Sequence, residues 1–98
     1  MTHAASLRSR LAGGESILMP GVWDPLSALL AQRAGFHTVF VSGFAVAGTL
    51  LGEPDIGIVD QANMADVARR VCAAAPDLCV VVDADTGYGD VHDVQTTT

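Results

Sequence analysis

Two aspartates that follow an apolar run are the residues with the clearest chemical potential in this sequence. The run Cys79–Val82 is followed by Asp83 and Asp85, and then by Gly87 and Gly89. An apolar, β-branched run predicts a strand buried on both faces, and positions i and i+2 of a strand face the same side. Two carboxylates on one side are costly unless they meet a cation or hydrogen-bond donors. The spacing therefore predicts either a metal site or a carboxylate pair that caps the next turn.

A second group of candidate residues follows another predicted strand. Ser42-Gly43 offers a hydroxyl and backbone N–H groups that can hold a carboxylate or phosphate, although an ordinary strand-to-loop turn would look the same. Oxygen ligands without nearby histidine or thiolate suit a hard ion such as Mg²⁺, which takes one or two protein carboxylates and keeps waters. Such an assembly favours metal-assisted stabilisation of an oxyanion, for example an enolate.

Helices and strands must alternate along the chain to place these groups together. We expect helices over 4–12, 25–34 and 61–75, strands over 16–19, 38–41 and 79–82, one or two helical turns over 45–51, and the start of a helix at residue 90. Asp24 and Asp60 are the expected N-caps of the second and third helices, and Gly35 the stop of the second. This order predicts right-handed parallel βαβ units, whose active residues gather at the carboxyl ends of the strands.

The predicted fold class is therefore α/β. Three parallel strands leave two open edges, and a (β/α)₈ barrel of ~250 residues is the natural completion. We expect residues 1–98 to form the N-terminal portion of one such barrel domain, truncated within a helix.

Composition narrows the possible partners. Half of the residues are hydrophobic and the net charge is −6, which favours a small folded domain and argues against nucleic acid and anionic membranes as partners. All five basic residues are arginines, so Schiff-base chemistry within this chain is excluded. Cys72 and Cys79 lack metal or redox spacing and are expected to be buried free thiols. Without a membrane-length apolar run or a secretory signal, we expect a soluble cytoplasmic protein.

Four blocks of this sequence carry a family resemblance. They are Pro20–Ala28, Val41–Gly43, Glu53–Gly57 and Val82–Gly89. In order and spacing they resemble the isocitrate lyase/phosphoenolpyruvate mutase superfamily, over nearly the whole chain. The resemblance implies a Mg²⁺-dependent barrel that acts on small 2-oxo or 2-hydroxy carboxylic acids through a metal-bound enolpyruvate-like species. It implies a carbon–carbon lyase or decarboxylase, with a phosphonomutase-type P–C bond enzyme as the alternative, and a homo-oligomer, a tetramer by resemblance.

The resemblance also assigns metal-binding roles by position. It implies that Asp85 is the direct Mg²⁺ ligand and that Asp83 and Asp55 hold metal-bound waters. From the residues alone, Asp55 is equally a turn former after Pro54.

At the positions that would bind substrate, this sequence matches the family at some residues and departs from it at others. Ser42 and Gly43 would bind the substrate carboxylate, with Phe44 beside them. Methylisocitrate lyases of the family usually have a tyrosine where this chain has Phe40, and a small residue where it has Phe44. The family's cysteine-bearing loop and later acidic ligand would lie beyond Thr98, so no catalytic acid or base is assigned here.

Two non-lyase classes of protein also place acidic residues on an α/β frame or lack catalysis altogether. A flavodoxin-like receiver needs an acidic pair after its first strand and a later lysine, and the sequence has neither. A non-catalytic α/β binding remnant stays open, and we expect the 98 residues alone to be inactive and prone to association through an unpaired strand edge.

Overall fold

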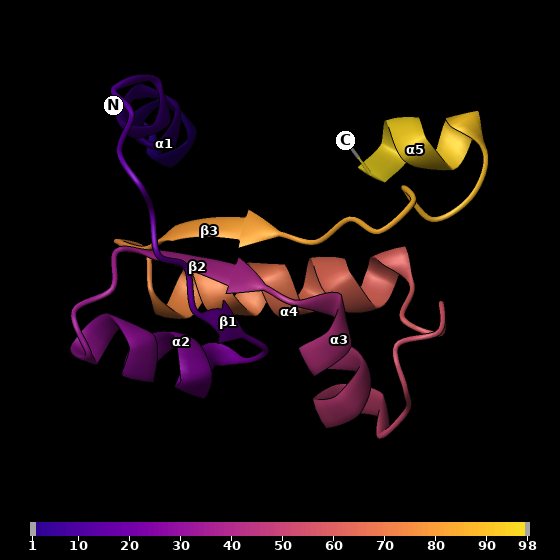
Figure 1. Ribbon diagram of the computed structural model, residues 1–98. Coiled ribbons are helices and arrows are strands. Elements are labelled where there is room, and N and C mark those ends of the chain that lie inside the picture. The colour runs from indigo at the N-terminus through magenta and orange to yellow at the C-terminus, as the bar shows by residue number, and fades with distance from the viewer. Residues whose placement is uncertain (1, 98) are drawn as a thin grey trace.

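The computed structural model describes residues 2–97, which form an α/β arrangement around a parallel sheet (Figure 1). The elements in chain order are α1 (His3–Ala12), β1 (Gly21–Val22), α2 (Pro25–Arg33), β2 (Thr38–Val41), α3 (Gly43–Val46), the π-helix η1 (Ala47–Leu51), α4 (Gln61–Ala74), β3 (Cys79–Val82) and α5 (Val91–Thr97). The sheet order is β1-β2-β3, and both strand pairs are parallel. The predicted α/β class with three parallel strands is confirmed.

Local signals account for the two main helices. Asp24 accepts a hydrogen bond from the Ser27 N–H at 2.7 Å, and Asp60 accepts one from the Asn63 N–H at 2.8 Å. Each cap is completed by a reciprocal bond from the N-cap backbone to the third helical residue. Gly35, with φ +99°, follows the end of α2. The predicted caps and the glycine stop are confirmed.

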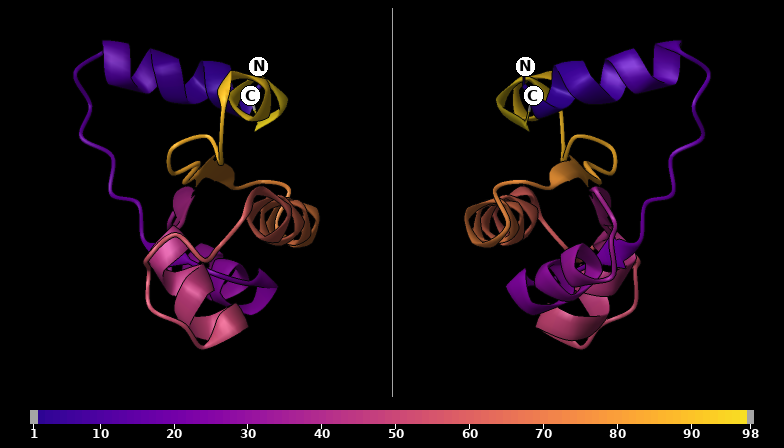
Figure 2. Two further views of the ribbon diagram at one scale, coloured as in Figure 1. Left: turned by 90° about the vertical axis from the view of Figure 1, so that its right-hand side faces the viewer. Right: turned by 90° about the vertical axis from the view of Figure 1, so that its left-hand side faces the viewer.

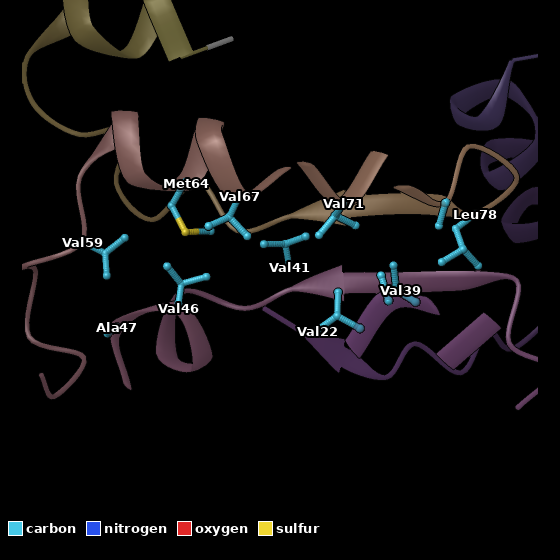
Figure 3. Close-up of a cluster of buried hydrophobic side chains, with 12 residues drawn as sticks. Val22, Val39, Val41, Val46, Ala47, Val59, Met64, Val67, Val71 and Leu78 are labelled. Atoms are coloured by element: carbon cyan, nitrogen blue, oxygen red, sulfur yellow. The ribbon is translucent and has the colours of Figure 1, made fainter. Parts of the chain in front are cut away.

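The core lies between β2 and α4. Val39 and Val41 lie two positions apart, on the same face of β2, and are fully buried. Figure 3 shows that Met64, Val67 and Val71 of α4 point toward them. The helical spacing of these three residues puts one stripe of α4 on the sheet, so α4 covers one face of the sheet.

The first strand differs from its prediction. A strand over 16–19 was expected, whereas β1 is Gly21–Val22 and Leu18 is 76% exposed. Gly21 pairs with Phe40, so a residue at position 18 would extend past Thr38, the first residue of β2. Most of the predicted strand has no neighbour to pair with in this part of the sheet, and the apolar run alone could not reveal that.

The third strand forms as predicted but is less buried. Val82 is 38% exposed, because it lines an open hollow between β3, α4 and α5 together with Met64 and Ala68. The expectation of burial on both faces is therefore wrong at the end of β3, which is an edge strand within residues 2–97.

The two cysteines separate. Cys79 is buried, as expected, but Cys72 is exposed. Cys72 follows the buried Val71, and a rotation of about 100° per helical residue turns it to water. The expectation of two buried thiols is wrong for Cys72.

The remaining segments frame the strand ends. Residues 43–51 form the expected helical turns, as α3 runs into η1 and ends at Gly52. Figure 2 shows α4 on one side of the sheet and the connection from α1 to β1 passing on the other.

No helix within residues 2–97 is long and apolar enough to cross a membrane.

Candidate metal centre

A small polar hollow lies where β2 and β3 end. Its volume is about 40 Å³, room for a water molecule or a small ion. It is lined by Gly43, Asp55, Gly57, Val59, Asp83, Asp85 and Tyr88. The structure thus brings the three predicted metal-site aspartates to one place at the carboxyl ends of parallel strands.

Asp83 joins the ends of the two strands. Its Oδ2 accepts a hydrogen bond from the Gly43 N–H at 3.2 Å, and its Oδ1 accepts one from the Asp85 N–H at 2.9 Å. A Cβ atom on Gly43 would lie 2.7 Å from Asp83 Oδ2, so only glycine allows this approach. The Asp83 carboxylate therefore holds the turn after β3 against the start of α3.

A turn, not a strand, brings Asp83 and Asp85 together. The predicted reason for their proximity was strand alternation, but β3 ends at Val82 and Asp85 adopts a left-handed backbone with φ +45°. The Asp83 side chain bonds the backbone two residues on, as aspartate commonly does in turns. The predicted alternation argument is wrong, although both residues line the same hollow.

Tyr88 closes one wall of this hollow. Its hydroxyl donates to the backbone carbonyl of Asp83 at 3.2 Å. Burial raises the pKa of Tyr88, and the charges of Asp83, Asp85 and Asp60 raise it further, because both effects disfavour a phenolate. Tyr88 is thus a neutral donor at physiological pH. Tyr88 belongs to the block Val82–Gly89, but the sequence predicted no site role for it.

The carboxylates of the hollow have no cationic partner in the described part of the chain. The ion pairs there involve Glu15 and Asp66 instead. Among residues 2–97, no three His, Cys, Asp or Glu side chains form a ready-made metal-binding group. Asp55, Asp83 and Asp85 line one hollow without forming a closed set of three ligands. This donor set fits Mg²⁺, which retains waters and binds few protein carboxylates directly.

The predicted substrate residues are placed less uniformly. Gly43 lines the hollow, whereas Ser42 and Phe44 do not. The Ser42 hydroxyl accepts a hydrogen bond from the Ala45 N–H at 3.3 Å and so caps α3. The Phe44 side chain is 72% exposed.

Besides Tyr88, two lining residues were not predicted. Gly57, with φ +84°, shapes the loop after Asp55, and its place in the block Glu53–Gly57 was the available signal. Val59 is a buried core residue, and no sequence feature linked it to the hollow.

Comparison with known proteins identifies the family. The family described as phosphoenolpyruvate phosphomutase matches residues 7–98. The chain belongs to the phosphoenolpyruvate mutase/isocitrate lyase superfamily. The resemblance carried by the four sequence blocks is therefore confirmed.

Curated relatives place the chain within this superfamily. The petal death protein of Dianthus caryophyllus is 51% identical over 80 residues, which cover 82% of this chain and 25% of that protein. The probable 2-methylisocitrate lyase 2 of Corynebacterium glutamicum is 46% identical over 85 residues, which cover 87% of this chain and 27% of that protein. Other relatives are named 2,3-dimethylmalate lyase and oxaloacetate decarboxylase.

Solved structures agree with the curated relatives. A 2,3-dimethylmalate lyase has a TM-score of 0.91 and 39% identity, covering 99% of this chain and 33% of that one. A phosphonopyruvate hydrolase in complex with oxalate and Mg²⁺ has a TM-score of 0.88 and 28% identity, covering 98% of this chain and 33% of that one. The chain thus spans about a quarter to a third of the length of these relatives.

Proposed function

We propose that this chain supplies the metal-binding part of a Mg²⁺-dependent carbon–carbon lyase or decarboxylase for small 2-oxo or 2-hydroxy carboxylic acids. The observation that carries the proposal is the shared hollow of Asp55, Asp83 and Asp85, which have no cationic partner in the described chain. The names of the relatives support the reaction class, since they include lyases and a decarboxylase. The Mg²⁺ and oxalate in the phosphonopyruvate hydrolase structure support the ion and the type of ligand.

The aspartates would hold the ion in different ways. Asp85 would bind Mg²⁺ directly, and Asp83 and Asp55 would hold its waters. Both Asp83 oxygens already accept backbone N–H bonds, which suits an indirect role. When bound, Mg²⁺ supplies Lewis-acid stabilisation of negative charge on a substrate oxygen.

Neighbouring residues would bind the substrate. The Ser42 hydroxyl accepts from the Ala45 N–H and keeps its own proton to donate to a substrate carboxylate. The Gly43 N–H is committed to Asp83, so Gly43 would contribute mainly space for close approach. The exposed Phe44 ring would form one wall of the substrate site.

Further β/α units would complete the site. Apolar side chains are exposed along both edges of the sheet and its helices, including Leu18, Leu26, Leu30, Val82, Val91 and Val94. We propose that residues 1–98 form the N-terminal part of one barrel domain whose remaining strands cover these edges and carry the acid–base groups. The 98 residues alone would then be inactive, and the complete protein would be a homo-oligomer that takes a small carboxylic acid.

The decisive test replaces the direct ligand in the complete protein. We expect Asp85→Ala to lower turnover of 2-oxo or 2-hydroxy acids by about 100-fold and to abolish stimulation by Mg²⁺. Asp66→Ala is a matched control, because Asp66 is a surface carboxylate on α4 that pairs with Arg69 and Arg70. Unchanged turnover and metal dependence in Asp85→Ala would refute the proposal.

The same assay separates the other candidate functions. Phosphonomutase chemistry is favoured by the phosphonopyruvate hydrolase structure and by a relative named carboxyvinyl-carboxyphosphonate phosphorylmutase. Turnover restricted to phosphonopyruvate-type substrates would support that function. A complete protein that neither binds Mg²⁺ nor turns over either class would support the non-catalytic remnant.

A further inference from the structure

Tyr88 stands in an unusual backbone conformation beside the metal centre. Its φ is +67°, and Asp85 is the other non-glycine residue with positive φ in the described part of the chain. A bulky side chain in the left-handed region is energetically unfavourable and persists only where the surroundings hold it there. The contacts of Tyr88 should therefore explain why the chain keeps it.

Those contacts tie the aromatic ring to the core and the hydroxyl to the metal-site turn. Tyr88 packs against the buried core cluster, while its hydroxyl donates to the Asp83 carbonyl at 3.2 Å. The ring lines the polar hollow with Asp85 on one side, and it lines the apolar hollow with Met64 and Val82 on the other. Tyr88 thus lies, like Asp83, between the two hollows, with contacts to both the metal-site turn and the side chains beside α4.

The flanking glycines leave the turn little freedom to move. A Cβ on Gly87 would meet the Val94 side chain of α5 at 2.5 Å, and a Cβ on Gly89 would collide with Asp93. The backbone on both sides of Tyr88 is therefore packed closely against α5. The packing of Gly87 and Gly89 restrains the position of Tyr88, in addition to the contacts of its own ring.

We propose that Tyr88 is a positioning residue of the metal centre. Its hydroxyl fixes the Asp83 backbone, and through it the carboxylates of Asp83 and Asp85. Asp83 is then held at three points, by the Gly43 N–H and the Asp85 N–H at its carboxylate and by the Tyr88 hydroxyl at its carbonyl. Within residues 2–97, the Tyr88 hydroxyl bonds a backbone carbonyl and no carboxylate oxygen, so it acts through Asp83. This inference rests on the proposed function.

The test separates metal affinity from stability in the complete protein. Mg²⁺ alone is titrated by calorimetry into wild type, Tyr88→Phe and Tyr88→Asn, and thermal unfolding is followed in parallel. Tyr88→Phe keeps the ring and removes the hydroxyl. Asparagine tolerates the left-handed backbone but lacks both ring and hydroxyl. Thr49→Val is the matched control, because the Thr49 hydroxyl donates to the Ala45 carbonyl away from the hollow.

We expect Tyr88→Phe to raise the Mg²⁺ Kd by about tenfold, as loss of an outer partner of a metal ligand does. Its Tm should fall no more than that of Thr49→Val, whose Kd should stay unchanged. Tyr88→Asn should raise the Kd at least as much as Tyr88→Phe.

The experiment distinguishes a failure of the Tyr88 inference from a failure of the proposed function. An unchanged Kd in Tyr88→Phe, with Mg²⁺ binding still lost in Asp85→Ala, would overturn the role of Tyr88 and leave the proposed function standing. Mg²⁺ binding that survives Asp85→Ala would overturn the metal centre itself and this inference with it.

Discussion

The charged groups at the two ends of the parallel sheet have different kinds of partner. At the amino-terminal end, α1 lies near the start of β3 (Figure 1). Arg10 forms a 2.8 Å ion pair with Glu15 and donates to the buried Thr38 hydroxyl at 3.5 Å. His3 Nε2 donates to the Pro76 carbonyl at 2.7 Å. Charged and buried polar groups at this end are thus satisfied by the chain itself.

At the carboxyl-terminal end, the carboxylates meet neutral donors. Asp83 accepts from two backbone N–H groups, and no basic side chain in residues 2–97 pairs with it or with Asp55 or Asp85. Neutral donors orient a carboxylate without cancelling its charge. The difference teaches that the polar groups at one end of the sheet stabilise the fold, whereas the carboxylates at the other end keep uncompensated charge. Under the proposed function this charge serves to bind a ligand, as at the carboxyl-terminal face of a β/α barrel.

The largest expected effect comes from filling the contact between Gly43 and Asp83. Gly43→Ala would place a Cβ 2.7 Å from Asp83 Oδ2 and displace the carboxylate from the Gly43 N–H. We expect the Mg²⁺ Kd to rise by about 100-fold, with a stability loss of about 1–3 kcal/mol from overpacking. Calorimetric titration and thermal unfolding of the complete protein measure the two effects.

Gly48→Ala is the matched control for this prediction. A Cβ on Gly48 has nothing within 4 Å, and alanine is favoured over glycine within a helix by about 0.5–1 kcal/mol. This variant should raise Tm and leave the Kd unchanged. Normal Mg²⁺ affinity in Gly43→Ala would mean that the close approach does not position Asp83.

A smaller effect, on stability alone, is expected from a substitution at the amino-terminal end. Thr38→Val keeps the buried shape and removes the hydroxyl that accepts from Arg10. We expect a stability loss of about 1 kcal/mol and an unchanged Mg²⁺ Kd, measured by thermal unfolding and calorimetry. If Thr38→Val weakened Mg²⁺ binding as strongly as Gly43→Ala, the functional distinction between the two ends would collapse.

Local chemistry in the sequence predicted much of this frame. The caps at Asp24 and Asp60, the stop at Gly35 and the strand over 38–41 each depend on neighbouring residues, and the structure has all of them. The clustering of Asp83 with Gly43 followed from the rule that parallel strands end at one edge. Features that depend on a few adjacent residues, or on the general rule for parallel strands, could therefore be predicted.

The errors arose where partners distant in the sequence decide the outcome. The register against β2 excludes most of the expected strand over 16–19, and the open hollow beside α4 exposes Val82. The Asp83–Asp85 turn depends on the left-handed backbone of Asp85, which the apolar run before it does not indicate, although that run did predict the end of β3. The Tyr88–Asp83 bond depends on a left-handed backbone at a tyrosine, which no propensity favours.

The smallest expected effect is a pH dependence of the amino-terminal end. The hydrogen bond from Arg10 holds the pKa of Glu15 below its ordinary value of 4.5, against a smaller opposing effect of desolvation. A carboxyl whose pKa is lowered by folding stabilises the fold above its unfolded pKa, and this contribution disappears as the pH falls through the folded pKa. Acidification below about pH 4.5 should therefore weaken the attachment of α1.

Thermal unfolding of wild type and Glu15→Gln across that range measures this contribution. Wild type should be the more stable protein near neutral pH, and its advantage should disappear in acid. The difference should be small and should shrink in high salt, because the pair is exposed to solvent. Glu53→Gln controls for the loss of an exposed acid, since Glu53 forms no ion pair in the described chain. An advantage of wild type that persisted in acid would show that Glu15 stabilises this end by something other than its charge, and would contradict the prediction.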